Sequence, residues 1–216
     1  MPAFTTENPA LRWCADIGME AIDRAPCSCK HATEFCRVNC YNLALYIRYG
    51  NMRPRDVRNE AFWNGPMSGA GIRRAFARKT KHQTKRARIM TRGEAFSSLA
   101  DVRKVEDLLG ENPGTIWWIP TRSWRHPVLR AFVRALAVKY TNCRIMASID
   151  PTTTKVELDG LVADGWSTMF FGNDDACPAV GAHKCAKTWK HAKGHCATCK
   201  AGCFKADRVD VWLKWH

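Results

Sequence analysis

Four cysteines lie close together near the start of the chain. Cys27, Cys29, Cys36 and Cys40 fall within fourteen positions of the stretch CSCKHATEFCRVNCYN. Four convergent thiolates suit a tetrahedral zinc ion or a [4Fe–4S] cluster, because both prefer soft sulfur ligands. A CxC pair followed by CxxxC is not the usual pair of zinc knuckles, so the spacing favours iron–sulfur, with zinc as the alternative.

A second set of cysteines lies near the C-terminus, in CPAVGAHKCAKTWKHAKGHCATCKAGCF. Cys177, Cys196, Cys199 and Cys203 give CP followed by CxxCxxxC, which is like ferredoxin-type ligation, where short loops wrap a cluster. Cys185 is a fifth thiol and the alternate ligand. Zinc competes here too, because neighbouring histidines can complete a tetrahedral site.

The cysteine count and the N-terminal residues bear on the cellular compartment. Eleven cysteines, an odd number, occur among 216 residues. The start, MPAFTTENPALRW, lacks the basic and apolar regions of a signal peptide, and no apolar stretch approaches the roughly 18 residues that cross a bilayer. We therefore expect a cytosolic protein without a membrane partner, whose clustered thiols bind metal rather than form disulfides.

An excess of positive charge favours an acidic partner. The formal net charge is +14, and residues 73–92 carry nine Lys or Arg and no acid. Such a block could lie along the phosphates of a nucleic acid. The alternative is a solvated loop or helix face, and with Phe76 as its one aromatic residue the block is a weak match to single-strand binders.

The elements that must position these residues alternate between strand and helix after the basic block. Strand patterns occur at 87–96, 115–120, 143–150, 166–172 and 210–216, and helical patterns at 34–49, 98–113, 126–142 and 155–165. Apolar strands that alternate with helices predict a parallel sheet covered on both faces. Because one or two further strands fit before the block, we expect a partial (β/α) barrel, with an open doubly wound sheet as the runner-up.

We expect one domain over residues 1–216. It comprises an N-terminal arm over 1–26, an α/β core over 27–176 that includes the first cysteines, and a cysteine-rich loop with the last strand over 177–216. In the helix expected at 34–49, Cys36 and Cys40 are four residues apart and would share one face.

Polar residues follow the predicted strands at their carboxyl ends, where barrel active sites are assembled. They are Arg92, Glu94, Thr121, Arg122, Arg125, Ser148, Asp150, Asn173, Asp174 and Asp175. Each alone is typical of a turn or cap, but together they indicate a shared site. Arg122 and Arg125 flank Trp124 and could clamp an anionic ligand beside a stacking ring. In the alternative, Trp124 packs and the arginines pair with aspartates.

The order of motifs resembles that of a family of phage-encoded cysteine-rich proteins. The matching motifs are Cys-x6-Cys-x3-Cys-Tyr from Cys29, then RGEAF, TRSWR, SIDP and a CP…CxxC tail, from about Cys27 to the C-terminus. That family is similar to radical S-adenosylmethionine enzymes. The resemblance implies a radical-SAM-like partial (β/α) barrel with a [4Fe–4S] cluster at its top face, and it aligns RGE with the strand motif that contacts the methionine amine of the cofactor.

The cysteine spacing departs from that of the radical enzymes. They present CxxxCxxC, whose three ligands leave one iron open, whereas this chain has CxC and then CxxxC. If Cys27 joins Cys29, Cys36 and Cys40 on one cluster, no iron is open. If it does not, S-adenosylmethionine can bind. We take Glu94, Arg122, Arg125 and Asp150 as the candidate cofactor-binding residues.

These observations lead to an expected function with two alternatives. The first expectation is a [4Fe–4S] protein with one or two clusters, redox-active or linked to S-adenosylmethionine, in the cytoplasm of the host cell if the gene is a phage gene. The alternative is a zinc-stabilised nucleic-acid-binding protein without catalysis. A third reading is a module that binds a host protein, with the clusters as structural supports.

Overall fold

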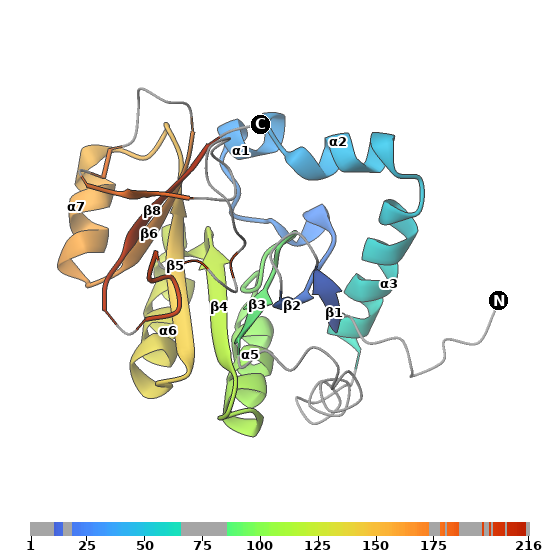
Figure 1. The fold of residues 1–216 in the computed structure, drawn as a ribbon, viewed down its shortest axis with the longest axis horizontal. Coiled ribbons are helices and arrows are strands. Elements are labelled where there is room, and N and C mark those ends of the chain that lie inside the picture. The colour runs from blue at the N-terminus through green and yellow to red at the C-terminus, as the bar shows by residue number, and fades with distance from the viewer. Residues whose placement is uncertain are drawn as a thin grey trace.

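The computed structural model describes residues 11–14, 19–65, 86–172, 178–179, 181–185, 196, 199, 201–205 and 207–214. Within these ranges the chain folds into one α/β unit (Figure 1). The predicted site residues Cys177, Asn173, Asp174 and Asp175 lie outside the described residues, as do residues 73–85 of the basic block.

The described strands form one eight-stranded sheet. They are β1 (Leu11–Cys14), β2 (Met19–Ile22), β3 (Arg86–Ile89), β4 (Ile116–Thr121), β5 (Cys143–Ile149), β6 (Ser167–Gly172), β7 (His183–Lys184) and β8 (Asp210–Lys214). Their order in the sheet is β1-β2-β3-β4-β5-β6-β8-β7. The β1–β2 pair is antiparallel and every other neighbouring pair is parallel.

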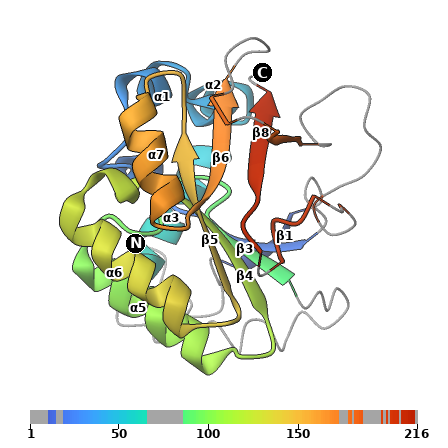
Figure 2. The ribbon, with the colours of Figure 1, turned by 90° about the vertical axis from the view of Figure 1, so that its left-hand side faces the viewer.

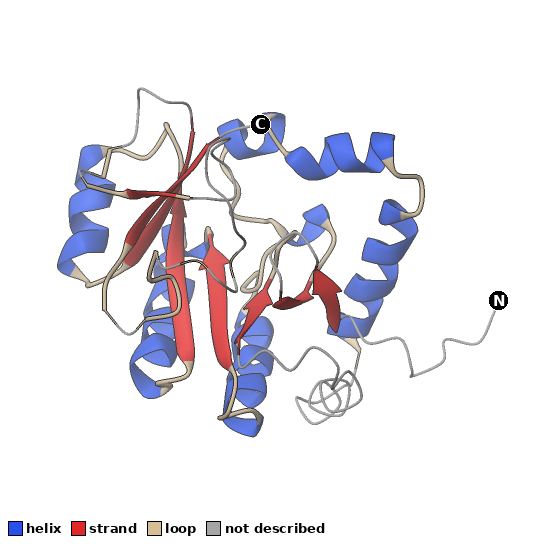
Figure 3. Cartoon of the chain, viewed as in Figure 1, coloured by secondary structure: helices blue, strands red, loops and turns tan. Residues whose placement is uncertain are grey.

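Some helical elements lie at the carboxyl ends of the strands, which we call the rim, and others lie on one face of the sheet. They are η1 (Pro26–Ser28), α1 (Glu34–Val38), α2 (Tyr41–Arg48), α3 (Met52–Asn64), α5 (Leu99–Glu111), η3 (Ser123–Arg125), α6 (Pro127–Lys139) and α7 (Lys155–Ala163). Figure 3 separates these helices from the strands, and α1 and α2 extend beyond the strands at one edge. The predicted α5, α6, α7, β4, β5 and β6 are all present, with ends within a few residues of those expected.

The strand order explains why the crossover helices share one side. From β2 to β6 each parallel strand lies beside the previous one in chain order, without the reversal that defines a doubly wound sheet. Right-handed crossovers that always advance in one direction place their helices on the same face. Figure 2 shows α5, α6 and α7 along one side of the strands. Among the described residues, the helices therefore cover one face of the sheet, whereas both faces were expected to be covered.

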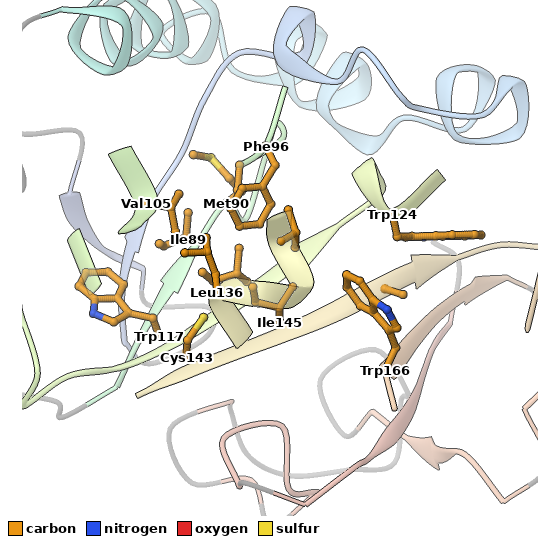
Figure 4. Packing of buried hydrophobic residues seen from close by; sticks show 14 of the residues in the cluster. Ile89, Met90, Phe96, Val105, Trp117, Trp124, Leu136, Cys143, Ile145 and Trp166 are labelled. Atoms are coloured by element: carbon orange, nitrogen blue, oxygen red, sulfur yellow. The ribbon is translucent and has the colours of Figure 1, made fainter. Parts of the chain in front are cut away.

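The two faces of the sheet have separate apolar clusters. The helix-bearing face packs Trp117, Ile119, Ile145 and Phe170 against α5 and α6, and Figure 4 shows part of this cluster, including buried Cys143 beside Trp117. No described helix contributes to the cluster on the opposite face, which we call the helix-free face. That smaller cluster comprises Ala21, Trp118, Met146, Met169, Phe204 and Val211. Trp117 and Trp118 alternate between the two clusters because successive strand residues point to opposite faces.

Residues 11–14 and 19–22, within the expected N-terminal arm, form two strands of the sheet, and one or two further strands were expected before the basic block. Two expectations about the residues that follow need correction. The single helix expected over 34–49 is two helices, because Asn39 ends α1 and donates its side-chain amide to the Phe35 carbonyl at 2.8 Å. Cys40 then adopts an extended conformation as the N-cap of α2, so Cys36 and Cys40 do not share one helix face.

In the part of the chain that the structure describes, every helix is too short or too polar to cross a membrane.

Candidate functional site

The first cysteines lie in the loop that leaves β2 at the carboxyl edge of the sheet. Ser28, which is buried, fixes this loop to the segment after β3. Its hydroxyl donates to the Ala25 carbonyl at 2.7 Å and accepts from the Glu94 amide at 2.8 Å. Ser97 donates its hydroxyl to the Ser28 carbonyl. The cysteine loop and the RGE segment therefore form one packed layer.

Gly93 makes this close approach possible. Its φ is +80°, and a Cβ there would lie 2.8 Å from the Arg24 Cβ, the Arg24 carbonyl oxygen and the Ser28 hydroxyl. Those distances are far below an ordinary contact, and two of the three atoms cannot move without moving backbone. Only glycine fits this position, so the RGE motif has a packing reason for its central residue.

Three of the four thiols of the first cluster interact with one another. Burial, followed by the charges of Glu94, Cys36 and Cys40, raises the pKa of Cys29 to about 12. Cys27, by contrast, has an exposed side chain. The arrangement thus groups Cys29, Cys36 and Cys40 and leaves Cys27 facing solvent.

A hydrogen-bonded chain holds Cys36 over the ends of β4 and β5. Thr33 is the N-cap of α1, where its hydroxyl accepts from the Cys36 amide at 3.1 Å. The same hydroxyl donates to Asp150 at 2.6 Å, and Arg122 donates to the same Asp150 oxygen at 2.6 Å. Burial raises the pKa of Cys36, while the Arg122 charge and its hydrogen bond to that thiol act in the opposite direction. Arg122 is therefore shared between a thiol and a carboxylate.

Asp150 is a carboxylate that several donors hold at this rim. It is fully buried, and its other oxygen accepts from the Thr152 hydroxyl at 2.6 Å and the Thr152 amide at 3.0 Å. Burial alone would raise its pKa, but the bonds from Thr152 and Thr33 and the charge of Arg122 hold the pKa below its usual value. Asp150 is thus a fixed anion that organises three elements.

Glu94 is also buried and fully engaged by its own chain. Its carboxylate accepts from the Thr121 hydroxyl at 2.7 Å, the Arg122 amide at 2.8 Å and the Phe96 amide at 3.1 Å. Burial nevertheless raises the pKa of Glu94 above the usual glutamate value, with these donors acting against it. A buried carboxylate with a raised pKa that borders a thiol cluster is typical of a functional site rather than of a surface turn.

Trp124 packs in the interior and Arg125 lies beside an aspartate, which is the alternative to a ligand clamp. Trp124 is buried and donates its indole N–H to the Ser148 carbonyl at 2.8 Å. The Arg125 guanidinium lies 4.1 Å from the centre of the Trp124 ring, donates to Thr153 at 2.8 Å and lies 3.9 Å from Asp150. Both predicted clamp arginines therefore contact Asp150.

Ion pairs join α3 to the segments that follow β2 and β3 at the rim. Arg92 donates its Nε to Asp56 of α3 at 3.1 Å and lies 3.3 Å from Asp23, while Arg24 pairs with Glu60 of α3 at 2.6 Å. These pairs connect α3 to the ends of β2 and β3. Because an unpaired buried charge is strongly destabilising, they fix the loops that carry Cys29 and Glu94.

The second cysteine set gathers on the helix-free face of the sheet. Burial, followed by the charges of Cys185, Cys196 and Cys199, raises the pKa of Cys203 to about 12. Cys185, Cys196 and Cys203 pack against the smaller apolar cluster. The alternate ligand Cys185 thus joins the predicted Cys196, Cys199 and Cys203, and its neighbours differ from those of the first set.

Both thiol groups have the chemistry of a soft-metal site. Among the described side chains, no group of three or more His, Cys, Asp or Glu already stands in metal-ligating geometry. The donors nevertheless fit a thiolate-bound centre in their chemistry, because thiols release their protons when they bind a soft metal ion. At the rim, Cys29, Cys36 and Cys40 would hold such a centre.

The described end of the basic block does not lie free on the surface. Arg86 stacks over Phe204 at 5.2 Å and Arg88 over Trp118 at 4.3 Å, both on the helix-free face. Arg92 is buried with Asp56 and Asp23. These three arginines already contact side chains of the protein itself. If the basic block binds phosphates, we expect its other lysines and arginines to make the contacts.

Sequence reasoning missed the residues that connect the site to its supports. Thr33 and Asp23 are the main ones. Asp23 follows β2 and accepts from the Thr91 and Arg92 amides at 2.9 and 3.0 Å. The signal for Asp23 was its position directly after a short strand, but the position of β2 was not predicted from the sequence. For Thr33 the signal was a threonine three residues before Cys36, the spacing of an N-cap.

Comparison with known proteins identifies a family but no characterised relative. No curated protein and no solved structure matches the chain. A family model described as Gene product 88, a name of the kind given to phage genes, matches residues 6–205 and so spans both cysteine sets. Because the match covers most of the 216 residues, the chain belongs to the Gene product 88 family.

Proposed function

We propose that the protein is a [4Fe–4S] protein of phage origin in which Cys29, Cys36 and Cys40 hold the cluster and leave one iron open. The observation that carries this proposal is the grouping of these three thiols at the carboxyl edge of the sheet, with Cys27 exposed. Three ligands rather than four are what a cluster needs to bind a further ligand, for which S-adenosylmethionine is the candidate.

The fold gives this proposal a suitable frame. From β2 to β6 the parallel strands follow one another in chain order with crossover helices on one face, as they do in a partial (β/α) barrel. Barrels and their relatives bind ligands at the carboxyl ends of the strands, and the three thiols lie at that edge. This supports a radical-SAM-like partial barrel, although fold similarity alone carries no reaction.

The residues around the thiols have distinct roles in this proposal. A bound cluster would supply one-electron chemistry to a ligand at its open iron. Arg122 places a positive charge against the Cys36 thiol and so offsets the negative charge of three thiolates. Asp150 holds Arg122 in place, and Glu94 accepts from the Thr121 hydroxyl and the Arg122 amide and so fixes the end of β4 beside the thiols. Arg125 stacked on Trp124 borders the same edge.

Electron paramagnetic resonance of the anaerobically reconstituted, reduced protein tests the open iron. We expect a [4Fe–4S] signal whose g-values change when S-adenosylmethionine is added, because a ligand at one iron alters the cluster. Glu94→Gln should weaken that change, whereas Glu106→Gln, on the outer side of α5 beside Lys139, should not. A signal unaffected by S-adenosylmethionine in the wild type would overturn the open-iron proposal.

Nucleic-acid binding is a second candidate, supported by the formal net charge of +14. Zinc rather than iron would then stabilise the fold, and no catalysis is required. This candidate predicts an affinity for DNA or RNA that falls steeply as salt rises, because bound phosphates release counterions. An electrophoretic mobility shift at low and moderate salt measures it, and no shift at low salt would exclude it.

A further inference from the structure

Four thiols from two separate segments meet on the helix-free face of the sheet. Cys185 directly follows β7, and Cys196, Cys199 and Cys203 precede β8. Cys185, Cys196 and Cys203 all pack against the apolar cluster of that face, and Cys199 lies between Cys196 and Cys203 in the chain. Cys177, which the spacing of the sequence favoured, lies outside the described residues.

The surroundings of these thiols are apolar. Phe204 is buried and packs edge-on against Trp118 with ring centres 5.8 Å apart, and Met146, Met169 and Val211 complete the cluster. Cys185, Cys196 and Cys203 contact this cluster directly. Thiolates are costly in such surroundings unless a cation neutralises them, so the position suits either protonated thiols or a bound metal.

The backbone near the thiols has features that suit a thiolate site. The Ala201 amide donates to the Cys199 sulfur at 3.4 Å. N–H bonds to sulfur are among the contacts by which a protein orients and tunes thiolate ligands. The Cys185 amide donates to the Trp212 carbonyl at 2.8 Å, which extends the β7–β8 pairing by one residue and fixes the backbone of this cysteine.

We propose that Cys185, Cys196, Cys199 and Cys203 form a closed four-thiolate metal site that is separate from the rim site. It takes a soft metal centre, either a zinc ion or a [4Fe–4S] cluster, whose four ligands leave no position for a substrate. Its role is structural, because it joins the β7 segment, the loop before β8 and the helix-free face. The thiols close around the centre as it binds, since they do not already stand in ligating geometry.

Metal and sulfide analysis of anaerobically purified full-length variants tests the ligand set. Cys185→Ala should lose the metal of one centre relative to the wild type, whereas Cys177→Ala should lose none. Loss of zinc alone identifies a zinc site, and loss of iron with an equal amount of sulfide identifies a cluster. The proposal is overturned if Cys177→Ala loses the centre and Cys185→Ala keeps it, or if neither variant loses metal.

Two further variants separate this result from misfolding and from the rim proposal. If the site binds zinc, Cys185→His should keep the metal, because Cys₃His is a common zinc ligand set. If the site binds a cluster, Cys185→Ser should keep more iron than Cys185→Ala. A zinc site whose metal is lost in Cys185→His, or a cluster site whose iron is no higher in Cys185→Ser than in Cys185→Ala, would count against a ligand role for Cys185. Cys36→Ala should remove only the rim centre, so an unchanged Cys36→Ala beside a depleted Cys185→Ala would refute the rim proposal alone.

Discussion

At the scale of single residues, the rim is organised by one buried carboxylate. Asp150 accepts hydrogen bonds from Thr33, Thr152 and Arg122, which belong to three different segments. Arg122 in turn reaches the Cys36 thiol. Loss of any of these groups leaves a buried donor or acceptor without its partner, and such losses cost more than the bond itself contributes. Side chains that are not themselves thiols thus decide how the rim cysteines are placed.

The depressed pKa of Asp150 predicts an acid-sensitive rim. The unfolded chain holds this carboxyl near its ordinary pKa of about 3.9, and the folded protein holds it lower. The stabilisation is therefore complete above the unfolded pKa and is lost as pH falls through the folded pKa. Asp150→Asn should lower the free energy of unfolding by on the order of 3 kcal/mol at pH 7, and by less at pH 3.

Urea denaturation at the two pH values, followed by circular dichroism, measures this difference. Asp164→Asn is the control, because Asp164 pairs with Arg130 in an exposed position. Its effect should stay below about 1 kcal/mol at both pH values. A deficit of Asp150→Asn that is equally large at pH 3 and pH 7 would argue against a charge-dependent role.

Gly93 gives a second prediction at this scale. Gly93→Ala combines a strained positive φ with a Cβ 2.8 Å from Arg24 and Ser28. Gly181→Ala is a matched control, since Gly181 has φ +78° and nothing within 4 Å of the added Cβ. The strain alone costs about 1–2 kcal/mol, so Gly181→Ala should cost no more than this. Gly93→Ala should cost clearly more and should reduce the iron content, as thermal unfolding and iron analysis will measure. Equal effects would mean that the close approach is not needed.

At the scale of elements, the break between α1 and α2 decides which thiols meet. A continuous helix would place Cys36 and Cys40 on one face, but the chain ends α1 at Asn39 and begins α2 with Cys40 as its cap. The two cysteines then approach Cys29 from separate elements. Short helices of this kind gain most of their stability from contacts outside the helix. For α1 that contact is the bond from Thr33 to Asp150.

Thr33→Ala tests this dependence, with Thr154→Ala as its counterpart. Both threonines are N-caps, and Thr154 caps the exposed start of α7. Loss of an N-cap costs about 1 kcal/mol. Thr154→Ala should show that cost and keep its iron, whereas Thr33→Ala should cost more and bind less iron, because Cys36 loses its fixed position. Denaturation curves measure the two free energies of unfolding, and iron analysis measures the bound iron. Equal iron in the two variants would refute a role of Thr33 in positioning Cys36.

At the scale of the whole molecule, the sequence predicted the central half of the fold well. β4, β5 and β6 are continuous apolar runs, and α5 and α6 carry apolar residues at helical spacing between clear caps. The α3 helix was missed because its buried residues include Asp56 and Asn59, which give no apolar pattern. β1 and β2 are four residues each and too short to predict alone.

The candidate site was predictable in part. The rule that polar residues gather at the carboxyl ends of parallel strands selected Glu94, Arg122 and Asp150, which the fold brings together. Spacing alone could not separate Cys27 from the other three thiols, because the choice depends on the turn η1 and the break at Asn39. Nor could it place Cys185 against the same apolar cluster as Cys203, because that position depends on the pairing of β7 with β8.

The iron and sulfide content of two single variants decides whether three thiolates hold a cluster at the rim. Wild type, Cys27→Ala and Cys36→Ala are purified without oxygen, and iron and acid-labile sulfide are measured per chain. We expect Cys27→Ala to match the wild type and Cys36→Ala to lose the iron and sulfide of one cluster. A colourless wild type with zinc and no sulfide, or an equal loss in both variants, would contradict a three-thiolate cluster at the rim.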